Sequence, residues 1–297
     1  GGGGMYNSSS NPTLQKVTFT ANQAGGTGWW IGGAGMYNDV SNPILENVIF
    51  SGNQATGVGS GSGGGAIYNM YSDPILVNVT LAGNYAWPGA AMYNMGATSS
   101  GSNPTLTNAI VWGNKPEAFN IRNDGSGSYA VVNYSLVQGG HAGTGNLDAD
   151  PLFVAPVDAD LAPSTEGNYR LRYDSPAIDA GNTLSVTAVT DLDGNPRVMG
   201  DDVDMGAYEF QAYILTVSLV GNGQVVKTPD QPAYTYLDQV VLTAAADPGW
   251  NFAGWSGDVI TTTNPLTLTI VGHTAITATF TQDEYTLDVS IVGDGAV

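Results

Sequence analysis

Three short phrases recur in a fixed order through the first half of the chain, and this repetition constrains the fold more than any other feature. The prolines at positions 12, 43, 74 and 104 are spaced by 31, 31 and 30 residues. Each unit has a short apolar run, a proline corner, an alternating strand and a Gly/Asn turn, without a helical period. The phrases are Met5-Tyr6-Asn7, Met36-Tyr37-Asn38, Ile67-Tyr68-Asn69 and Met92-Tyr93-Asn94; Asn11-Pro12, Asn42-Pro43, Asp73-Pro74 and Asn103-Pro104; and Phe19, Phe50, Leu81 and Val111, each followed three residues later by Asn.

Units of this kind predict a right-handed parallel β-helix over residues 1–147. One unit alone cannot bury its apolar side chains, but coils stacked about 4.8 Å apart bury them against the coils above and below. The side chains expected to lie inside, one above another, are Val17 and Phe19, Val48 and Phe50, Val79 and Leu81, and Ile110. The side chains expected to stack as an amide ladder along the axis are Asn47, Asn78, Asn108 and Asn133.

The charge balance argues against two classes of partner. The chain has 7 Lys and Arg against 26 Asp and Glu, which gives a formal net charge of −19. This charge repels nucleic-acid phosphates and anionic lipid head groups. No apolar run reaches the roughly 18–20 residues needed to cross a bilayer. We therefore expect no membrane insertion of these residues, and because of the charge we expect no nucleic-acid partner.

The absence of Cys excludes disulfides and thiolate metal sites. Any export signal or anchor is expected to lie outside these residues.

After residue 147 the pattern changes to Asp-rich turns between short apolar runs, and residues 148–210 are expected to close the β-helix. The phrases that mark this segment are Asp150-Pro151-Leu152-Phe153, Ser175-Pro176-Ala177-Ile178-Asp179, Asp193-Gly194-Asn195-Pro196-Arg197 and Val203-Asp204-Met205-Gly206-Ala207-Tyr208-Glu209. The segment resembles the one that closes many bacterial β-helix surface proteins of the choice-of-anchor Q type. The resemblance implies an exported protein and identifies no reaction.

A third pattern begins near Tyr213, with an alternating strand followed by a Gly221-Asn222-Gly223 hairpin turn. Residues 211–282 resemble an internalin-type B-repeat through the phrase Gly249-Trp250-Asn251-Phe252-Ala253-Gly254-Trp255 and the closing strand that ends at Phe280. The resemblance implies a small β-grasp-like module. Residues 283–297 repeat the opening of this module and are expected to begin a second copy. The predicted fold class is therefore all-β, a right-handed parallel β-helix followed by a small β-grasp-like module.

One cluster of acidic residues has the spacing of a calcium loop. Ca²⁺ binds several oxygen ligands from a flexible loop, and the predicted ligands are Asp191, Asp193, Asn195, Asp202 and Asp204, with Asp201 nearby. Pro196 stands where the comparable helix-flanked calcium loop has Gly. The alternative is that these side chains close tight turns through their own backbone. Calcium is the one cofactor that the sequence predicts.

Two further groups of residues are candidates for contact with partners. Trp29, Trp30 and Trp87 fall in Gly-rich loops and are predicted to form an aromatic shelf for sugar rings or for another protein; the alternative is that they cap the coil stack. The apolar residues Leu287, Val289 and Ile291, with Tyr285, lie on one predicted strand. That strand is expected to pair with another module or with a neighbouring copy of the chain.

These features favour an extracellular or cell-surface protein with a structural or adhesive function, such as a filament or sheath subunit, whose partners are copies of itself or cell-surface polymers. The alternative is a secreted polysaccharide-binding protein, or a polysaccharide lyase or hydrolase of the β-helix type, and it rests on fold analogy. Hydrolases need two carboxylates at a fixed separation, and the carboxylates of the coils are scattered. We therefore assign no catalytic residue.

Overall fold

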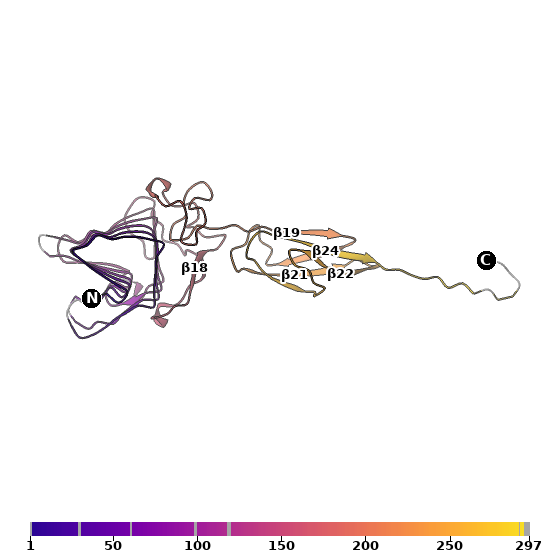
Figure 1. Ribbon diagram of the computed structural model, residues 1–297, viewed down its shortest axis with the longest axis horizontal. Coiled ribbons are helices and arrows are strands. Elements are labelled where there is room, and N and C mark those ends of the chain that lie inside the picture. The colour runs from indigo at the N-terminus through magenta and orange to yellow at the C-terminus, as the bar shows by residue number, and fades with distance from the viewer. Residues whose placement is uncertain are drawn as a thin grey trace. The chain divides into compact units, whose positions relative to one another are not determined.

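The computed structural model describes residues 2–28, 31–59, 61–97, 100–117, 120–290 and 292–293. Trp29, Trp30 and Ile291, which the sequence singles out, lie outside the described residues. The chain divides into two compact units, Gly1–Phe210 and Gln211–Val297. The first unit is a β-solenoid, and its stacked coils trace a three-sided outline at the indigo and violet end of the chain (Figure 1). The second is a small β-sheet domain.

The solenoid has three faces, each a sheet of parallel strands from successive coils. The first sheet stacks β1 (Met5–Ser8), β5 (Met36–Asp39), β8 (Ile67–Met70), β11 (Met92–Met95) and β14 (Ile121–Asp124). The second contains β2 (Thr13–Gln15), β3 (Thr18–Thr20), β6 (Ile44–Ser51), β9 (Ile75–Ala82), β12 (Thr105–Thr107), β13 (Ile110–Trp112), β15 (Val131–Asn133) and β16 (Leu136–Val137). The third contains β4 (Gln23–Ala24), β7 (Gln54–Ala55) and β10 (Tyr85–Ala86). The parallel β-helix predicted from the repeats is therefore confirmed.

The interior row of the second sheet follows the repeat, with one correction. Phe19, Phe50, Leu81 and Val111 are in register with one another, and the Phe19 and Phe50 rings stack with their centroids 4.6 Å apart. Ile110 was expected in this row, but it pairs with Thr80 and packs in a different cluster, on the outer side of the sheet. The interior position in that coil belongs to Val111.

The asparagines of the second sheet occupy a corner that requires left-handed backbone. Asn47, Asn78 and Asn108 have φ of 53°, 52° and 55°, a conformation that Asn tolerates better than most residues. The amide of Asn108 donates to Asn78 Oδ1 at 2.9 Å. The predicted ladder does not continue to Asn47, because the Asn47 amide donates to the Thr190 carbonyl at 2.9 Å and Asn47 Oδ1 and Asn78 Nδ2 have no partner among the described residues. Asn133 was expected as the next rung, but it pairs with Thr107 instead. The corner of that coil is Tyr134, with φ of 48°.

Two further asparagine ladders run along the stack, one on the strands of the first sheet and one at the corner before the third sheet, and every rung is hydrogen-bonded. In one ladder each side-chain amide donates to the next carbonyl at 2.8–2.9 Å, through Asn7, Asn38, Asn69, Asn94 and Asn123. The other runs through Asn22, Asn53, Asn84 and Asn114 at 2.8–2.9 Å. Because buried polar groups are costly when they lack a partner, these ladders fix which residues of adjacent coils lie opposite one another.

Residues 148–210 form a closing segment that lies along the outer side of the second sheet. It contains β17 (Phe153–Ala155), β18 (Asn168–Leu171) and two 3-10 turns, η2 (Ala159–Leu161) and η3 (Thr183–Ser185). Its apolar side chains, among them Phe153, Leu171 and Met205, cover Ile49 and Ile110. Because both sides of this sheet are covered, apolar residues lie on both of its faces.

Polar contacts fasten the closing segment to several coils. Glu46 accepts hydrogen bonds from the backbone of Thr187 and Ala188, at 2.9 and 2.7 Å, and from the Thr187 hydroxyl at 2.7 Å. Burial alone raises the pKa of Glu46, but these bonds outweigh it and the pKa is lowered. Further contacts join Lys16 to Thr190, Asn108 to Asn182, and Gly52 to Ser164.

Substitutions at two glycines test how closely the closing segment packs against the coils. Gly52 and Gly113 occupy the same left-handed corner in different coils, with φ of +58° and +64°. A Cβ on Gly52 would lie 2.2 Å from the Ser164 carbonyl oxygen, whereas a Cβ on Gly113 meets nothing within 4 Å. We expect Gly52→Ala to lower the unfolding free energy of the solenoid by about 1–3 kcal/mol more than Gly113→Ala, measured by chemical denaturation. Equal losses of unfolding free energy in both variants would show that the closing segment does not pack against the corner at Gly52.

The second unit contains two three-stranded sheets. One has the order β19 (Leu215–Val220), β24 (Thr274–Gln282) and β22 (Trp250–Gly257), with β19 parallel to β24. The other has the order β20 (Gly223–Thr228), β21 (Gln239–Ala246) and β23 (Leu266–Thr269). The core includes Tyr234, Leu242, Trp255 and Phe280. Parallel first and last strands agree with a β-grasp-like module, but residues 211–290 contain no helix.

Candidate functional site

A hollow opens on the side of the solenoid where a lateral loop becomes shorter. The loop between β7 and β8, residues 56–66, has 11 residues, whereas the loop between β10 and β11, residues 87–91, has 5. The difference of six residues equals the shortening of the step between successive Met/Ile-Tyr-Asn phrases, from 31 residues (36 to 67) to 25 (67 to 92). The longer loop therefore extends further from the stack than the shorter loop, and a recess is left beside the shorter loop.

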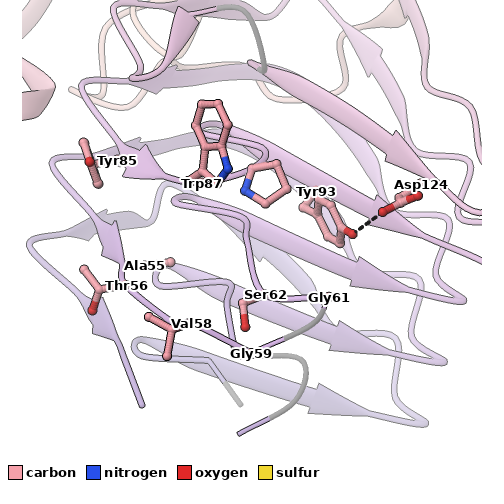
Figure 2. A pocket seen from close by; sticks show the side chains of 12 residues that line it. Ala55, Thr56, Val58, Gly59, Gly61, Ser62, Tyr85, Trp87, Tyr93 and Asp124 are labelled. Carbon is pink, nitrogen blue, oxygen red and sulfur yellow. Dashed lines mark hydrogen bonds between the residues drawn. The ribbon is translucent and has the colours of Figure 1, made fainter. Parts of the chain in front are cut away.

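The recess has a volume of about 550 Å³. Its lining comes from three consecutive parts of the stack: residues 55–59 and 61–62, then Tyr85, Trp87 and Pro88, then Tyr93 and Asp124. Figure 2 shows the indole of Trp87 standing on its loop, with Tyr93 and Asp124 on neighbouring strands beside it. The Trp87 side chain is 63% exposed. The structure therefore places one of the three predicted contact tryptophans in a concave site.

A column of tyrosines supports the wall of this recess. Tyr37, Tyr68 and Tyr93 are buried next to Met70 and Met95, and the rings of Tyr37 and Tyr68 stack with centroids 4.6 Å apart. The Tyr93 hydroxyl donates to Asp124 Oδ2 at 2.7 Å. Burial, together with this bond to a carboxylate, raises the pKa of Tyr93, so the hydroxyl keeps its proton. The polar end of this wall is a neutral donor bound to an exposed carboxylate.

The arrangement can bind a flat ligand with polar groups on its edge. An exposed indole offers an electron-rich face to C–H groups or to another ring. Asp124 already accepts one bond on each oxygen, from Tyr93 and from the Gly125 backbone at 2.9 Å, and each carboxylate oxygen has a further lone pair. Among the described lining residues, Asp124 is the one carboxylate.

The predicted calcium ligands do not form one ligand set. Asp191 accepts from the backbone of Asn195 at 2.8 Å and of Glu209 at 3.0 Å. Asp193 is paired with Arg170 at 2.6 Å, and Asp202 accepts from the Thr183 hydroxyl at 2.8 Å. Asp204 accepts from the backbone of Asp179 at 2.8 Å and also from Phe210. No group of three or more His, Asp or Glu within the described part of the chain is placed to hold a metal ion. Calcium at this loop stays a prediction.

These residues surround a buried charge cluster instead. Arg197 is 1% exposed and Glu209 4% exposed, and they form an ion pair with Arg197 Nη1 3.3 Å from Glu209 Oε2. Arg197 also donates to the carbonyl oxygens of Asp204 and Gly206, at 2.8 and 2.7 Å. Burial, reinforced by the charge of Asp204, raises the pKa of Glu209 to about 8. Burial likewise raises the pKa of Asp204 to about 6.

The raised pKa of Glu209 predicts a dependence of stability on pH. A carboxyl whose folded pKa exceeds its ordinary value of 4.5 stabilises the fold fully below that value, and this contribution is lost as pH rises through about 8. We expect Glu209→Gln to remove this pH-dependent loss. The difference in stability between variant and parent should therefore shift in favour of the variant as pH rises from 5 to 8. Thermal melting of both proteins across this range measures the difference. Parallel pH profiles for the two proteins would contradict the shift.

The described residues of the predicted assembly strand are not paired with another strand. Residues 283–290 have no strand assignment, and the side chains of Tyr285, Leu287 and Val289 are 85%, 86% and 57% exposed. These described residues therefore present apolar side chains without burying them. Their pairing with another module or copy stays a prediction.

Sequence reasoning identified Trp87 but missed Tyr85, Tyr93 and Asp124. Tyr93 belongs to a repeated phrase, so it looked like a structural residue, and Asp124 lies in a coil with a different sequence. The signal that points to the site is the short step between the third and fourth Tyr-Asn phrases. A lateral loop that is six residues shorter than the loop of the preceding coil leaves room for a recess.

Comparison with known proteins identifies one part of the chain. Residues 213–284 match the family model of the divergent InlB B-repeat domain. No curated protein and no solved structure matches the chain. No helix within the described ranges is long and apolar enough to cross a membrane. The resemblance of residues 148–210 to the choice-of-anchor Q segment stays a prediction. The chain is thus a β-solenoid followed by a domain similar to the B-repeat family, which is associated with surface or extracellular proteins.

Proposed function

We propose that this chain is part of an extracellular adhesive protein, in which the solenoid is a rigid scaffold that presents a binding site and the B-repeat region is a spacer. The observation that carries the proposal is the recess at Trp87, an exposed aromatic side chain that lines the recess together with Tyr93, the end of a column of buried tyrosines. The asparagine ladders and the closing segment support it, because they hold the loops around the recess in fixed register. Cell-surface polymers are the partners that this arrangement favours.

Binding is favoured over cleavage by the composition of the recess. Glycoside hydrolysis uses a pair of carboxyl groups on either side of the scissile bond. The described residues that line the recess supply one carboxylate, Asp124, which is engaged by Tyr93. A polysaccharide-binding function therefore fits the recess better than a hydrolase function does. The exposed side chains of Tyr285 and Leu287 favour self-assembly as a second role.

Surface display is tested on cells that make the protein. Antibodies raised against residues 1–210 are applied to intact and to permeabilised cells, and intact cells are also treated with an external protease. The proposal predicts equal labelling of both preparations and loss of the epitope after protease treatment. Labelling that requires permeabilisation would contradict it.

A further inference from the structure

We propose that the recess at Trp87 binds uncharged sugar residues, neutral hexoses or N-acetylhexosamines, within a polysaccharide. This inference rests on the proposed adhesive function and names the class of ligand for its site. It is argued from the size of the recess, the position of its aromatic side chains, and the sign and location of its charge.

The size and openness of the site suit part of a polymer. Small-molecule pockets have volumes of about 300–1,000 Å³, and the recess, at about 550 Å³, lies within this range. It opens on the side of the solenoid, where Trp87 is exposed. A site for a small free ligand encloses most of its surface, whereas Trp87 remains 63% exposed.

The aromatic lining matches a pyranose ring. One face of such a ring carries C–H groups, which pack against the negative face of an indole, and its edge carries hydroxyl groups. Trp87 supplies the flat surface and Tyr85 a second aromatic group on the same coil. Ser62 and the described residues 57–59 and 61 of the glycine-rich loop add polar groups to the lining. A sugar residue can pack one face against an aromatic ring and form hydrogen bonds at its edge. An aliphatic peptide does not combine these two contacts.

The charge of the recess selects against acidic sugars. Asp124 is exposed at the recess and has a free lone pair on each oxygen to accept sugar hydroxyls. A uronate or sialate carboxylate at the same place meets a like charge, in a chain whose formal net charge is −19. Among the described residues, no Lys or Arg lines the recess; Arg122, which is in register with Tyr93 and whose charge acts on the Tyr93 hydroxyl, is not one of the lining residues. The ligand is therefore an uncharged sugar.

Isothermal titration of the full chain tests the inference. The probes are tetramers of glucose, of mannose and of N-acetylglucosamine, with a tetramer of galacturonic acid as the acidic comparison. We expect at least one neutral tetramer to bind and the galacturonate tetramer to bind at least about tenfold more weakly. Trp87→Ala is expected to weaken the neutral ligand about tenfold or more. Tyr129→Ala removes an aromatic side chain that is 58% exposed but does not line the recess, and should change affinity less than twofold.

Asp124→Asn separates the charge from the shape of the site. This variant keeps the size of the side chain and an acceptor for Tyr93, so we expect it to reduce the preference for the neutral over the acidic tetramer by several-fold. Unchanged binding by Trp87→Ala, preferential binding of galacturonate by the parent, or no binding of any neutral tetramer at millimolar concentration would each overturn the inference. The surface-labelling experiment does not depend on these ligands, so a failure here leaves the proposed surface location standing.

Discussion

Replacing Phe50 by Asp is expected to unfold the solenoid under conditions in which the parent chain is folded. The Phe50 side chain is fully buried, and its ring stacks on Phe19 in the middle of the interior row. An aspartate there has no partner among the surrounding apolar side chains, and the ring contact with Phe19 and the packing against Leu81 are lost. The expected loss of unfolding free energy exceeds about 4 kcal/mol. Circular dichroism during thermal and chemical denaturation measures it.

The control for this variant lies on the same strand. Ile44 is on β6 with Phe50, but 42% of its side chain is exposed. Ile44→Asp introduces the same charge at the surface and is expected to cost less than about 1 kcal/mol. The transition of residues 211–297 should be unchanged in both variants, because they belong to the other compact unit. If Phe50→Asp melted like Ile44→Asp, the register of the stack would be wrong.

Replacing Arg197 by Met is expected to be the second most destabilising change. Arg197 is the buried cation of a cluster in which Asp191, Asp204 and Glu209 are also buried. Its removal leaves buried carboxylates without a counter-charge and leaves the carbonyl oxygens of Asp204 and Gly206 without their donor. Breaking a buried pair in this way typically costs about 3–5 kcal/mol. The cost should be larger at pH 8 than at pH 5, because the carboxyl of Glu209, with its raised pKa, is protonated at the lower pH.

Two further variants distinguish the effect of the lost charge from general destabilisation of the closing segment. In the double variant Arg197→Met with Glu209→Gln, the carboxylate left behind becomes neutral, so we expect part of the stability to return. Arg172→Met removes an exposed arginine of the same segment and is expected to change stability by less than about 0.5 kcal/mol. If the double variant were no more stable than Arg197→Met at pH 8, the ion pair would not be what stabilises this cluster.

The repeats were sufficient to predict the stack, and the errors lie where the repeat pattern carries no information. Ile110 was placed inside because apolar residues usually mark one face of a strand. In this sheet the closing segment also covers the outer face, so Ile49 and Ile110 are buried there as well, and hydrophobicity does not distinguish Ile110 from Val111. Asn133 was placed in the ladder by residue type, whereas the left-handed corner of its coil is at Tyr134.

The site was less predictable for a related reason. Trp87 was found because an exposed tryptophan in a glycine-rich loop is conspicuous, but Asp124 lies 37 residues further along the chain. Only the register of the stack brings it beside Tyr93. The acidic residues between Asp191 and Asp204 have the spacing of ligands, yet Asp191 and Asp204 accept backbone hydrogen bonds, and Asp193 is paired with Arg170. Spacing in the sequence alone does not distinguish a carboxylate that binds a metal ion from one that accepts hydrogen bonds within a folded loop.

The most direct test of the account is a crystal structure of residues 1–297 grown with the neutral tetramer that binds best. We predict a sugar ring packed on the indole of Trp87, a ring hydroxyl within hydrogen-bond distance of Asp124, and Phe19, Phe50, Leu81 and Val111 in one interior row. A tetramer bound elsewhere, or an empty recess at saturating ligand, would contradict the account.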